Sequence, residues 1–408
     1  MEHSNTGSQT VKTKLISNIV LIGLVSLFVD MSSEMVYPLI PLFLTANLGA
    51  SPAIVGIIEG IAESIASLLK VFSGYIGDVY HNKKRLTLIG YSASVVYKLL
   101  LLLAGSWVGV LAARVIDRTG KGIRTAPRDA LVAQSSDTKK LGGSFGLHKM
   151  LDMAGSSLGA LLAFVFVATG TGFHTAFLYS IIPAVIGISL ISAVREDKSK
   201  QQSSEKLSFK GVKLDKKLKL YLGVMFIFCL GNSSNTFLLL KAKENGFSAS
   251  QVMLLYFIFN VSASILAIPS GRLSDRLGRS SVLVPAYAIY GLVYLGFALF
   301  TAKPAIIVLF LAYGAYTAFI GGAERAFIAE AAPAGFKGTV LGIYGMLQGI
   351  GLLLSSILAG AMWDRINSGA PFWFGGILGL ISAFFISLIL GGNHIAKLFK
   401  RNTAITPE

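Results

Sequence analysis

Charged residues and cysteines are both scarce in this sequence. Asp, Glu, Lys and Arg make up 14% of its 408 residues, whereas they make up about 25% of an ordinary soluble protein. The one cysteine, Cys229, lies in an apolar stretch, which excludes a disulfide framework and a cysteine-based metal site. The sequence has no Gly-x-x-x-x-Gly-Lys-Ser/Thr segment, so we do not expect an ATP-driven pump. No set of residues suggests a nucleophile, a metal site or a cofactor site, and we expect no enzymatic activity.

Hydrophobic residues dominate what is present. They account for 53% of the chain, and they gather in stretches of roughly 20 residues, the length that crosses a bilayer. Lys and Arg exceed Asp and Glu by 36 to 20, which gives a formal charge of +16. In a soluble protein this charge would suggest a nucleic-acid partner, but such partners require a solvated basic face. The chain is therefore expected to be a polytopic membrane protein that contacts lipid and no nucleic acid.

Hydropathy predicts twelve membrane-spanning helices. They cover approximately residues 15–44, 52–76, 86–104, 106–135, 142–169, 173–194, 218–242, 249–272, 280–301, 304–332, 336–362 and 371–391. An all-α membrane fold follows, because lipid offers no partner to backbone groups left unpaired. The fourth segment carries so many charges that hydropathy alone would miss it. We retain it because its counterpart in the second half, 304–332, is far more apolar.

The placement of basic residues predicts the orientation. Most of the 36 Lys and Arg lie in the termini and in the connections on the amino-terminal side, whereas the opposite connections contain only Lys241, Lys243, Lys303 and Arg365. The positive-inside rule therefore predicts that both termini face the cytoplasm. The membrane that we expect the chain to span is the cytoplasmic (inner) membrane. The expected parts are a tail (1–14), an N-terminal six-helix bundle (15–194), a basic cytoplasmic linker (195–217), a C-terminal six-helix bundle (218–391) and a second tail (392–408). We expect a monomer.

An internal repeat relates the two halves. Gly74 and Asp78 recur at a constant offset as Gly271 and Asp275. The recurrence predicts two six-helix bundles in the same orientation. Duplicated halves in parallel topology are a known plan for carriers, whose substrate site lies between the halves near the membrane midplane.

These residues resemble the major facilitator superfamily over the helical core. The signature loop of that family, Gly-x-x-x-Asp-Arg-x-Gly-Arg, is matched at every defined position by the segment from Gly271 to Arg279. The first-half copy keeps Gly74 and Asp78 but has Val79, His81 and Asn82 where the family has Arg, Gly and Arg, and we expect Lys83 to Arg85 to supply the missing charge. The resemblance implies a cytoplasmic gate, in which glycine permits a tight turn and charged residues pair across a cleft. The residues expected to form it are Gly74, Asp78, Lys83, Arg124, Arg128, Asp129, Gly271, Asp275, Arg276, Gly278 and Arg279.

Two further segments resemble motifs of the superfamily's proton-coupled antiporters. The segment from Arg114 to Gly122 is similar to Arg-x-x-Gln-Gly-x-Gly-x-Gly, with Asp117 and Arg118 in place of the Gln and the first Gly. The segment from Gly155 to Ala160 is similar to Gly-x-x-x-Gly-Pro, with alanine in place of proline. The resemblance implies that Arg114 takes part in proton coupling.

Charged residues inside membrane segments are costly and are functional candidates by default. Asp30 and Glu34 share a helix face, as do Glu59 and Glu63, because each pair is four residues apart. The expected proton-coupling residues are Asp30, Glu34, Glu59, Glu63, Arg114, Asp117, Arg118, Lys121 and Asp152. A carboxyl group beside arginine in a partly dry cavity feels opposing influences on its proton affinity, so substrate occupancy can change its protonation. The alternative is a set of fixed buried salt bridges that hold the helices together.

The second half carries amides and aromatic residues where the first half carries charges. We therefore expect its polar residues to line a substrate cavity: Asn232, Asn235, Asn260, Tyr313, Tyr316 and Gln348. Three other polar residues lie in membrane segments. Lys98 is expected to extend to the outer interface, His148 to be a hydrogen-bonded core residue, and Glu324 to pair with the adjacent Arg325.

The sequence predicts a secondary active transporter that exchanges protons for a small organic solute by alternating access, with export favoured. One alternative is an organic-anion carrier in which Arg114 and Arg118 bind a carboxylate or phosphate directly. Another is a membrane sensor that uses the same scaffold without transport. No metal and no cofactor are expected.

Overall fold

The computed structural model describes residues 5–79, 83–135, 141–196, 214–333 and 337–402, and within these ranges it contains helices and no strand. The helices are α1 (Asn5–Glu34), η1 (Tyr37–Leu39), α2 (Ile40–Leu42), η2 (Phe43–Asn47), α3 (Pro52–Val79), α4 (Lys83–Leu102), α5 (Trp107–Gln134), α6 (Leu141–Ala168), α7 (Phe173–Ile191), α8 (Lys216–Gly231), α9 (Thr236–Glu244), α10 (Ala249–Leu277), α11 (Ser280–Leu299), α12 (Lys303–Ala331), α13 (Lys337–Arg365) and α14 (Ala370–Asn402). The predicted all-α fold is confirmed.

Each of the twelve predicted segments has a helical counterpart. Eleven helical stretches among the described residues are long and apolar enough to cross a membrane, and α5 is the predicted segment that hydropathy leaves out. The structure nevertheless forms α5 as one helix from Trp107 to Gln134, packed against α3 and α4. At the ends of the chain, α1 begins at Asn5 and α14 continues to Asn402, beyond the predicted edges. A helix satisfies its own backbone and can therefore extend past its apolar stretch.

Two predicted helices are interrupted in the structure. The first predicted helix is regular until Glu34 and then passes through the turn of η1, which contains Pro38. Proline has no N–H to donate and its ring obstructs the preceding turn, so a change of helix geometry is expected there. The seventh predicted helix is divided into α8 and α9, with residues 232–235 outside both.

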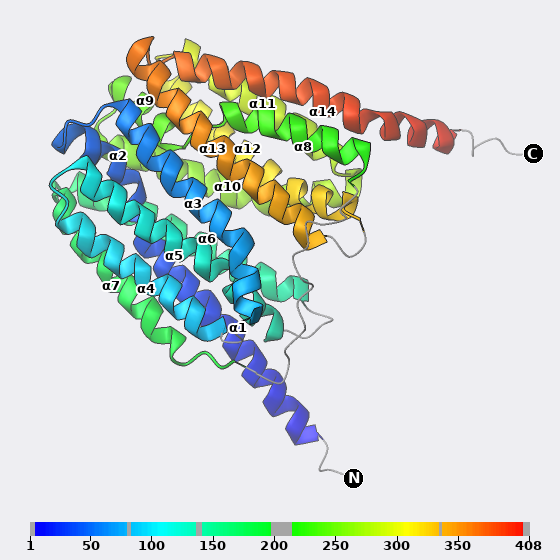
Figure 1. Cartoon of the computed structure of the whole chain (residues 1–408), viewed down its shortest axis with the longest axis horizontal. Coiled ribbons are helices and arrows are strands. Elements are labelled where there is room, and N and C mark those ends of the chain that lie inside the picture. The colour runs from blue at the N-terminus through cyan, green and yellow to red at the C-terminus, as the bar shows by residue number, and fades with distance from the viewer. Residues whose placement is uncertain (1–4, 80–82, 136–140, 197–213, 334–336, 403–408) are drawn as a thin grey trace, which may run out of the picture. The chain divides into compact units, whose positions relative to one another are not determined.

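The chain divides into two compact units. The first comprises Met1–Lys206 and Ala242–Phe257, and the second comprises Leu207–Lys241 and Ile258–Glu408. In the first unit α1 packs against α6 and α7, α4 packs against α5 and α7, and α3 packs against α5 (Figure 1). In the second unit α11 packs against α12 and α14, and α8 packs against α13 and α14. The predicted domain boundaries stay a prediction, and most of the linker, residues 197–213, lies outside the described residues.

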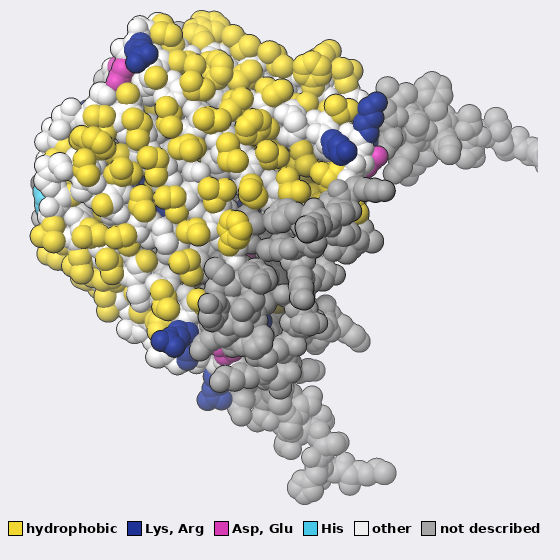
Figure 2. Space-filling view, in the orientation of Figure 1, with side chains coloured by type: hydrophobic (Ala, Val, Ile, Leu, Met, Phe, Trp, Pro, Cys, Tyr) yellow, Lys and Arg dark blue, Asp and Glu magenta, His cyan; other side chains and the backbone are white. Residues whose placement is uncertain are grey.

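Hydrophobic side chains cover much of the described surface on the face that Figure 2 shows. Leu103 is 82% exposed, and Ile265 and Ile366 are each 67% exposed. Soluble proteins rarely expose apolar patches larger than a few hundred Å². An apolar exterior with its charged residues inside is the pattern expected of a chain that lipid surrounds.

Candidate functional site

Three helices of the first unit bring charged faces together. α1 carries Asp30 and Glu34, and α3 carries Glu59 and Glu63. The spacing of four residues places each pair on one side of its helix. α5 contributes most of the basic residues, beginning with Arg114.

Glycines of α5 allow its neighbours to approach closely. A Cβ atom at Gly120 would lie 2.5 Å from the backbone oxygen of Gly90 in α4, and one at Gly122 would lie 2.5 Å from the Cβ of Leu69 in α3. Real Cβ atoms essentially never come this close to other atoms. The two glycines therefore let α5 lie between α3 and α4, which brings its basic residues within reach of the acids of α3.

A buried ion pair joins Glu59 and Arg114. The Nε of Arg114 donates to Glu59 Oε1 at 3.0 Å, and its Nη2 donates to Glu59 Oε2 at 2.7 Å. Both side chains are 1% exposed. This two-point contact fixes the orientation of the guanidinium group as well as neutralising its charge.

A second group of charges adjoins this pair. Arg118 Nη2 lies 2.8 Å from Glu63 Oε1, and Arg114 Nη2 lies 3.7 Å from the same oxygen. Asp117 lies 3.7 Å from both arginines. The ring of Tyr37 faces both guanidinium groups, with centroid distances of 5.4 Å and 5.7 Å. Cations are attracted to such ring faces.

A cavity opens among these side chains and encloses about 350 Å³ of empty space, part of it open to the outside. It is lined by Asp30, Ser33, Glu34, Tyr37, Tyr97, Arg114, Asp117, Arg118, Lys121 and Arg124. Four of these residues are basic and three are acidic. Among the described residues, no group of three or more His, Cys, Asp or Glu side chains is arranged to hold a metal ion.

The two acids of α1 have different partners. Asp30 is 18% exposed, and its Oδ1 lies 3.9 Å from Arg124 Nη2. Glu34 Oε2 accepts a hydrogen bond of 2.7 Å from the hydroxyl of Tyr256, in the part of α10 that belongs to the first unit. Arg124, which the sequence assigns to the cytoplasmic gate, thus lines the charged cavity.

Asp152 is placed beside α5 by its position on α6. Its Oδ2 accepts a hydrogen bond of 2.8 Å from Lys149, and its Oδ1 lies 3.9 Å from Arg128. Arg128 also pairs with Asp129 at 2.9 Å. These contacts connect α6 with α5, and Asp152 does not line the cavity.

His148 is a hydrogen-bonded core residue, as the sequence predicts. Its Nε2 lies 3.0 Å from Ser26 Oγ, which in turn lies 3.0 Å from the hydroxyl of Tyr91. The ring of Tyr91 faces Arg124 at 4.5 Å. A polar chain therefore links α6, α1 and α4 to the edge of the cavity.

Four of the residues predicted to line a substrate cavity come together in the second unit. Asn232 Nδ2 donates to the hydroxyl of Tyr316 at 3.2 Å, and the hydroxyl of Tyr313 donates to Asn235 Oδ1 at 2.7 Å. The rings of the two tyrosines lie 5.4 Å apart. The result is a compact group of amides and aromatic rings from α12 and the segment between α8 and α9.

The other two predicted residues make different contacts. The backbone oxygen of Asn260 accepts a hydrogen bond from Ser264 within α10. Gln348 of α13 donates to the hydroxyl of Tyr344 at 2.5 Å.

Side chains form hydrogen bonds with the backbone groups of the segment that joins α8 to α9. The pairs are Tyr290 hydroxyl to Gly231 oxygen at 2.7 Å, Ser355 hydroxyl to Asn232 oxygen at 3.0 Å, and Ser234 N–H to Ser356 hydroxyl at 3.2 Å. Irregular backbone at membrane depth is tolerated where protein buries it or a cavity adjoins it. The interruption is therefore a built feature of the second unit.

The predicted gate residues of the first unit are partly outside the described structure. Gly74 and Asp78 lie in α3, but the side chain of Asp78 lies outside the described residues. The backbone N–H of Lys83 donates to Glu196 Oε1 at 2.9 Å, and that of Lys84 donates to Glu196 Oε2 at 3.2 Å. The carboxylate of Glu196 thus caps the amino terminus of α4, where negative charge is favourable.

In the second unit the last residue of the predicted loop is held in place. Arg279 Nη2 lies 2.7 Å from Glu330 Oε1 on α12, and Arg279 Nη1 donates to Ser274 at 2.8 Å. Arg276 is exposed. The side chain of Asp275 lies outside the described residues.

Gly278 directly follows α10 and has a φ of +91°, and no atom lies within 4 Å of the place where its Cβ would be. Because residues with a Cβ rarely adopt this backbone conformation, Gly278→Ala is expected to lower the free energy of unfolding by about 1–2 kcal/mol. Gly271→Ala is the matched control, since Gly271 also faces open space but has no positive φ. Thermal unfolding of the purified variants in detergent measures the difference. Equal stability of the two variants would contradict this account of the turn.

Sequence reasoning missed some residues of the cavity and misplaced others. Tyr37 follows Asp30 and Glu34 at the spacing of one helix face, and that period is the signal that could have found it. Lys98 does not extend to an interface: it is fully buried, and its Nζ donates to the backbone oxygen and hydroxyl of Ser94. Ser94 lies one turn away and offers two acceptors.

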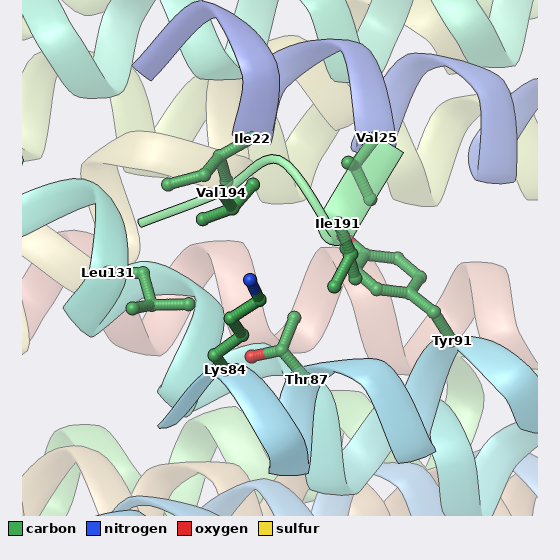
Figure 3. Close-up of a pocket in the computed structure, with 8 residues that line it drawn as sticks. All are labelled: Ile22, Val25, Lys84, Thr87, Tyr91, Leu131, Ile191 and Val194. Carbon is green, nitrogen blue, oxygen red and sulfur yellow. The ribbon is translucent and has the colours of Figure 1, made fainter. Parts of the chain in front are cut away.

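A second pocket of the first unit is apolar. Its empty space is about 240 Å³, part of it open to the outside, and it is lined by Ile22, Val25, Lys84, Thr87, Tyr91, Leu131, Ile191 and Val194. Figure 3 shows the amine of Lys84 between these side chains; it donates to the backbone oxygen of Ser192 at 2.8 Å. No predicted functional residue lies in this pocket.

Comparisons with known proteins agree with the fold. A family model described as Major Facilitator Superfamily matches residues 22–240 and 220–404. An uncharacterised MFS-type transporter of Methanocaldococcus jannaschii is 36% identical over 386 residues, covering 92% of this chain and 96% of that protein. The multidrug resistance protein MdtH of Photorhabdus laumondii is 27% identical over 137 residues, or 34% of each chain.

Among solved structures, a mutant of the nucleoside transporter NupG has a TM-score of 0.77 at 13% identity, covering 91% of this chain and 99% of that one. This likeness concerns the fold alone. Together with the family match, it confirms the predicted fold of two repeated helical halves. The chain belongs to the Major Facilitator Superfamily of membrane transporters.

Proposed function

We propose that this transporter exchanges protons for a small organic solute across the cytoplasmic membrane, in the direction of export. The observation that carries the proposal is the cavity of the first unit, where Asp30 and Glu34 face four basic side chains. The resemblance to the multidrug resistance protein, over 34% of this chain, supports export.

The carboxyl groups of the cavity supply a means of coupling. Asp30 has its nearest cation 3.9 Å away, and Glu34 accepts a hydrogen bond from a tyrosine rather than from a cation. Neither acid is held by the two-point contact that fixes Glu59. Burial and neighbouring cations act in opposite directions on the proton affinity of a carboxyl group. A substrate that enters the cavity changes this balance, and protons and substrate are exchanged.

The remaining predictions complete the proposal. The two bundles give alternating access, both termini are cytoplasmic, and the transporter acts as a monomer. The amides and tyrosines of the second unit contact the substrate, and the loop residues at the ends of α3 and α10 act as the cytoplasmic gate. Glu59, Arg114, Asp117, Arg118 and Lys121 position the titrating acids Asp30, Glu34 and Glu63 and balance their charge.

Proton flux in proteoliposomes tests the proposal. Vesicles that contain the purified protein and a pH-sensitive dye are given a pH gradient and screened for solutes that accelerate its collapse. Asp30→Asn, Glu34→Gln and Glu63→Gln should each abolish solute-dependent proton flux, because the amide cannot titrate. Glu244→Gln is the control, since Glu244 is an exposed acid of α9.

The variants of Asp30, Glu34 and Glu63 must remain folded for this comparison to be valid. Their elution as a single species in detergent and their unfolding temperatures establish this. Undiminished solute-dependent proton flux in all three variants would refute proton coupling through the cavity. If no solute moves even in the unaltered protein, the membrane-sensor function is favoured.

A second candidate function has one observation in its favour. Arg118 Nε and Arg124 Nη1 are buried and donate no hydrogen bond to a described residue, and both side chains line the cavity. Free guanidinium donors suit a carboxylate or phosphate. The Arg114 guanidinium already holds Glu59, so Arg118 and Arg124 are the stronger anion-binding candidates. Transport that small organic anions inhibit, and neutral or cationic drugs do not, would support this function.

A further inference from the structure

Glu324 is a buried acid of the second unit that the proposed function does not use. It lies in α12 and is 4% exposed. The ion pair with Arg325 expected from the sequence is not formed. Among the described residues, no lysine or arginine nitrogen lies within 4 Å of its carboxylate, and the side chain of Arg325 is exposed.

Three tyrosines from three other helices surround this carboxylate. The hydroxyl of Tyr221 donates to Oε1 at 3.1 Å, and that of Tyr344 donates to Oε2 at 2.7 Å. The hydroxyl of Tyr287 also donates to Oε1. Gln348 donates in turn to the hydroxyl of Tyr344, which extends the chain of hydrogen bonds along α13.

Among the described residues, no second acid lies against Glu324, and the one base near it, Arg325, forms no ion pair with it. The titratable or charged groups that face it are Tyr221 and Cys229 from α8, Tyr287 from α11, Tyr344 from α13, and Tyr316 and Arg325 from α12 itself. Aromatic rings close this environment: Phe327 lies 4.5 Å from the ring of Tyr221, and Phe228 lies 4.4 Å from that of Tyr287. The carboxylate of Glu324 is therefore surrounded by phenolic hydroxyls and aromatic rings.

Both charge states of this carboxyl group can be satisfied in place. An ionised carboxylate accepts hydrogen bonds only, and three phenolic donors supply them. Without those donors, a buried carboxylate that lacks a cation would be strongly disfavoured. When the carboxyl group binds a proton it becomes a donor, and a tyrosine hydroxyl can rotate to accept, since hydroxyls both donate and accept. The surroundings of Glu324 therefore accommodate its carboxyl group both with and without a proton.

We propose that Glu324 is a proton-binding site of the second unit, which takes up one proton and releases it again through its three tyrosines. This inference goes beyond the proposed function, because proton binding at Glu324 does not depend on coupling in the first unit. Its use during transport does rest on the proposed function. The two are therefore tested by separate measurements.

Infrared difference spectroscopy of the purified full-length protein tests proton binding without a substrate. A change of pH should produce the carbonyl band of a protonated carboxyl group together with tyrosine bands. Glu324→Gln should remove that carboxyl band and lower proton uptake by one per protein. Glu330→Gln, which alters an exposed acid of the same helix, should keep the band.

Further variants keep the proposal testable if Glu324→Gln does not fold. Glu324→Asp keeps a titratable group, and Tyr287→Phe and Tyr344→Phe keep the carboxyl group but each remove one donor. The tyrosine variants should change the pH at which the band appears. If Glu324→Gln folds and leaves the carboxyl and tyrosine bands unchanged, the proposal is overturned. If Glu324→Gln does not fold, unchanged bands in the two tyrosine variants overturn it instead.

Transport distinguishes this inference from the proposed function. Loss of solute-driven proton flux in Glu324→Gln, with downhill exchange of solute preserved, places the site in the transport cycle. Proton-coupled flux with an unchanged infrared spectrum in Glu324→Gln overturns the inference and leaves the proposed function intact. A third outcome is that the unaltered protein shows the carboxyl band but no proton flux, and that Glu324→Gln removes the band. This outcome would support the inference about Glu324 and overturn the proposed function.

Discussion

Replacing Arg114 with methionine is expected to lower the free energy of unfolding by about 3–5 kcal/mol, the cost of removing one partner from a buried ion pair. Glu59 is 1% exposed and pairs with Arg114 through two hydrogen bonds. The variant leaves the Glu59 carboxylate without a cation in contact. Denaturant unfolding of the purified protein in detergent measures the loss.

The double variant Glu59→Met with Arg114→Met separates the pair from its surroundings. Replacing a whole buried ion pair by apolar side chains is often neutral or stabilising, so the double variant should recover most of the stability that Arg114→Met loses. A double variant less stable than both single variants would contradict this interpretation.

The same double variant distinguishes a structural role from a transport role. If the pair only joins α3 to α5, the stable double variant should retain solute-dependent proton flux. If Arg114 takes part in coupling, the double variant should be stable and inactive. The proteoliposome assay therefore decides between the two alternatives that the sequence leaves open.

Most of the fold follows from local patterns in the sequence. Apolar stretches of the right length predict the helices, and the repeat predicts two parallel halves. α5 shows that the internal repeat adds information, because its charges hide it from hydropathy while its second-half counterpart α12 remains apolar. The break between α8 and α9 was not predicted, because its stability comes from side chains of α11 and α13, far away in the sequence.

The sequence predicts which charged residues form the site, but it does not predict which acid contacts which base. Spacing placed Asp30 and Glu34 on one face, and both do line the cavity. Which acid meets which base depends on side-chain reach and helix depth, which a sequence pattern does not specify. The position of Arg124 along α5 predicted a place in the cytoplasmic gate, but its side chain lies 3.9 Å from Asp30.

Glu324 shows why neighbours in a helical sequence are poor guides to contacts. Consecutive residues of a helix point about 100° apart, so the carboxylate of Glu324 and the guanidinium of Arg325 face different surroundings. The actual partners of Glu324 come from α8, α11 and α13. A signal was present in α11, where Tyr287, Tyr290 and Tyr294 recur at helical spacing.

Replacing Gly155 with leucine is expected to have the second-largest effect, because α6 lies against the backbone of α1 at this point. A Cβ at Gly155 would meet the backbone of Leu27, with the Cα and carbonyl carbon each 2.8 Å away. Extra methylenes in a packed interior cost about 1–3 kcal/mol and occasionally more. Gly155→Ala should fall between leucine and the unaltered protein in thermal unfolding.

The matched control is Gly223→Leu in α8, where no atom lies within 4 Å and the helix face is exposed. That variant should unfold at the same temperature as the unaltered protein.

One turn further along α6, a Cβ at Gly159 would lie 2.8 Å from the Cβ of Glu34. The approach of α6 to α1 therefore sets the position of the acids in the cavity. Gly155→Leu should lose solute-dependent proton flux even where it remains folded, and unaltered stability and flux in Gly155→Leu would show that this helix contact does not position the site.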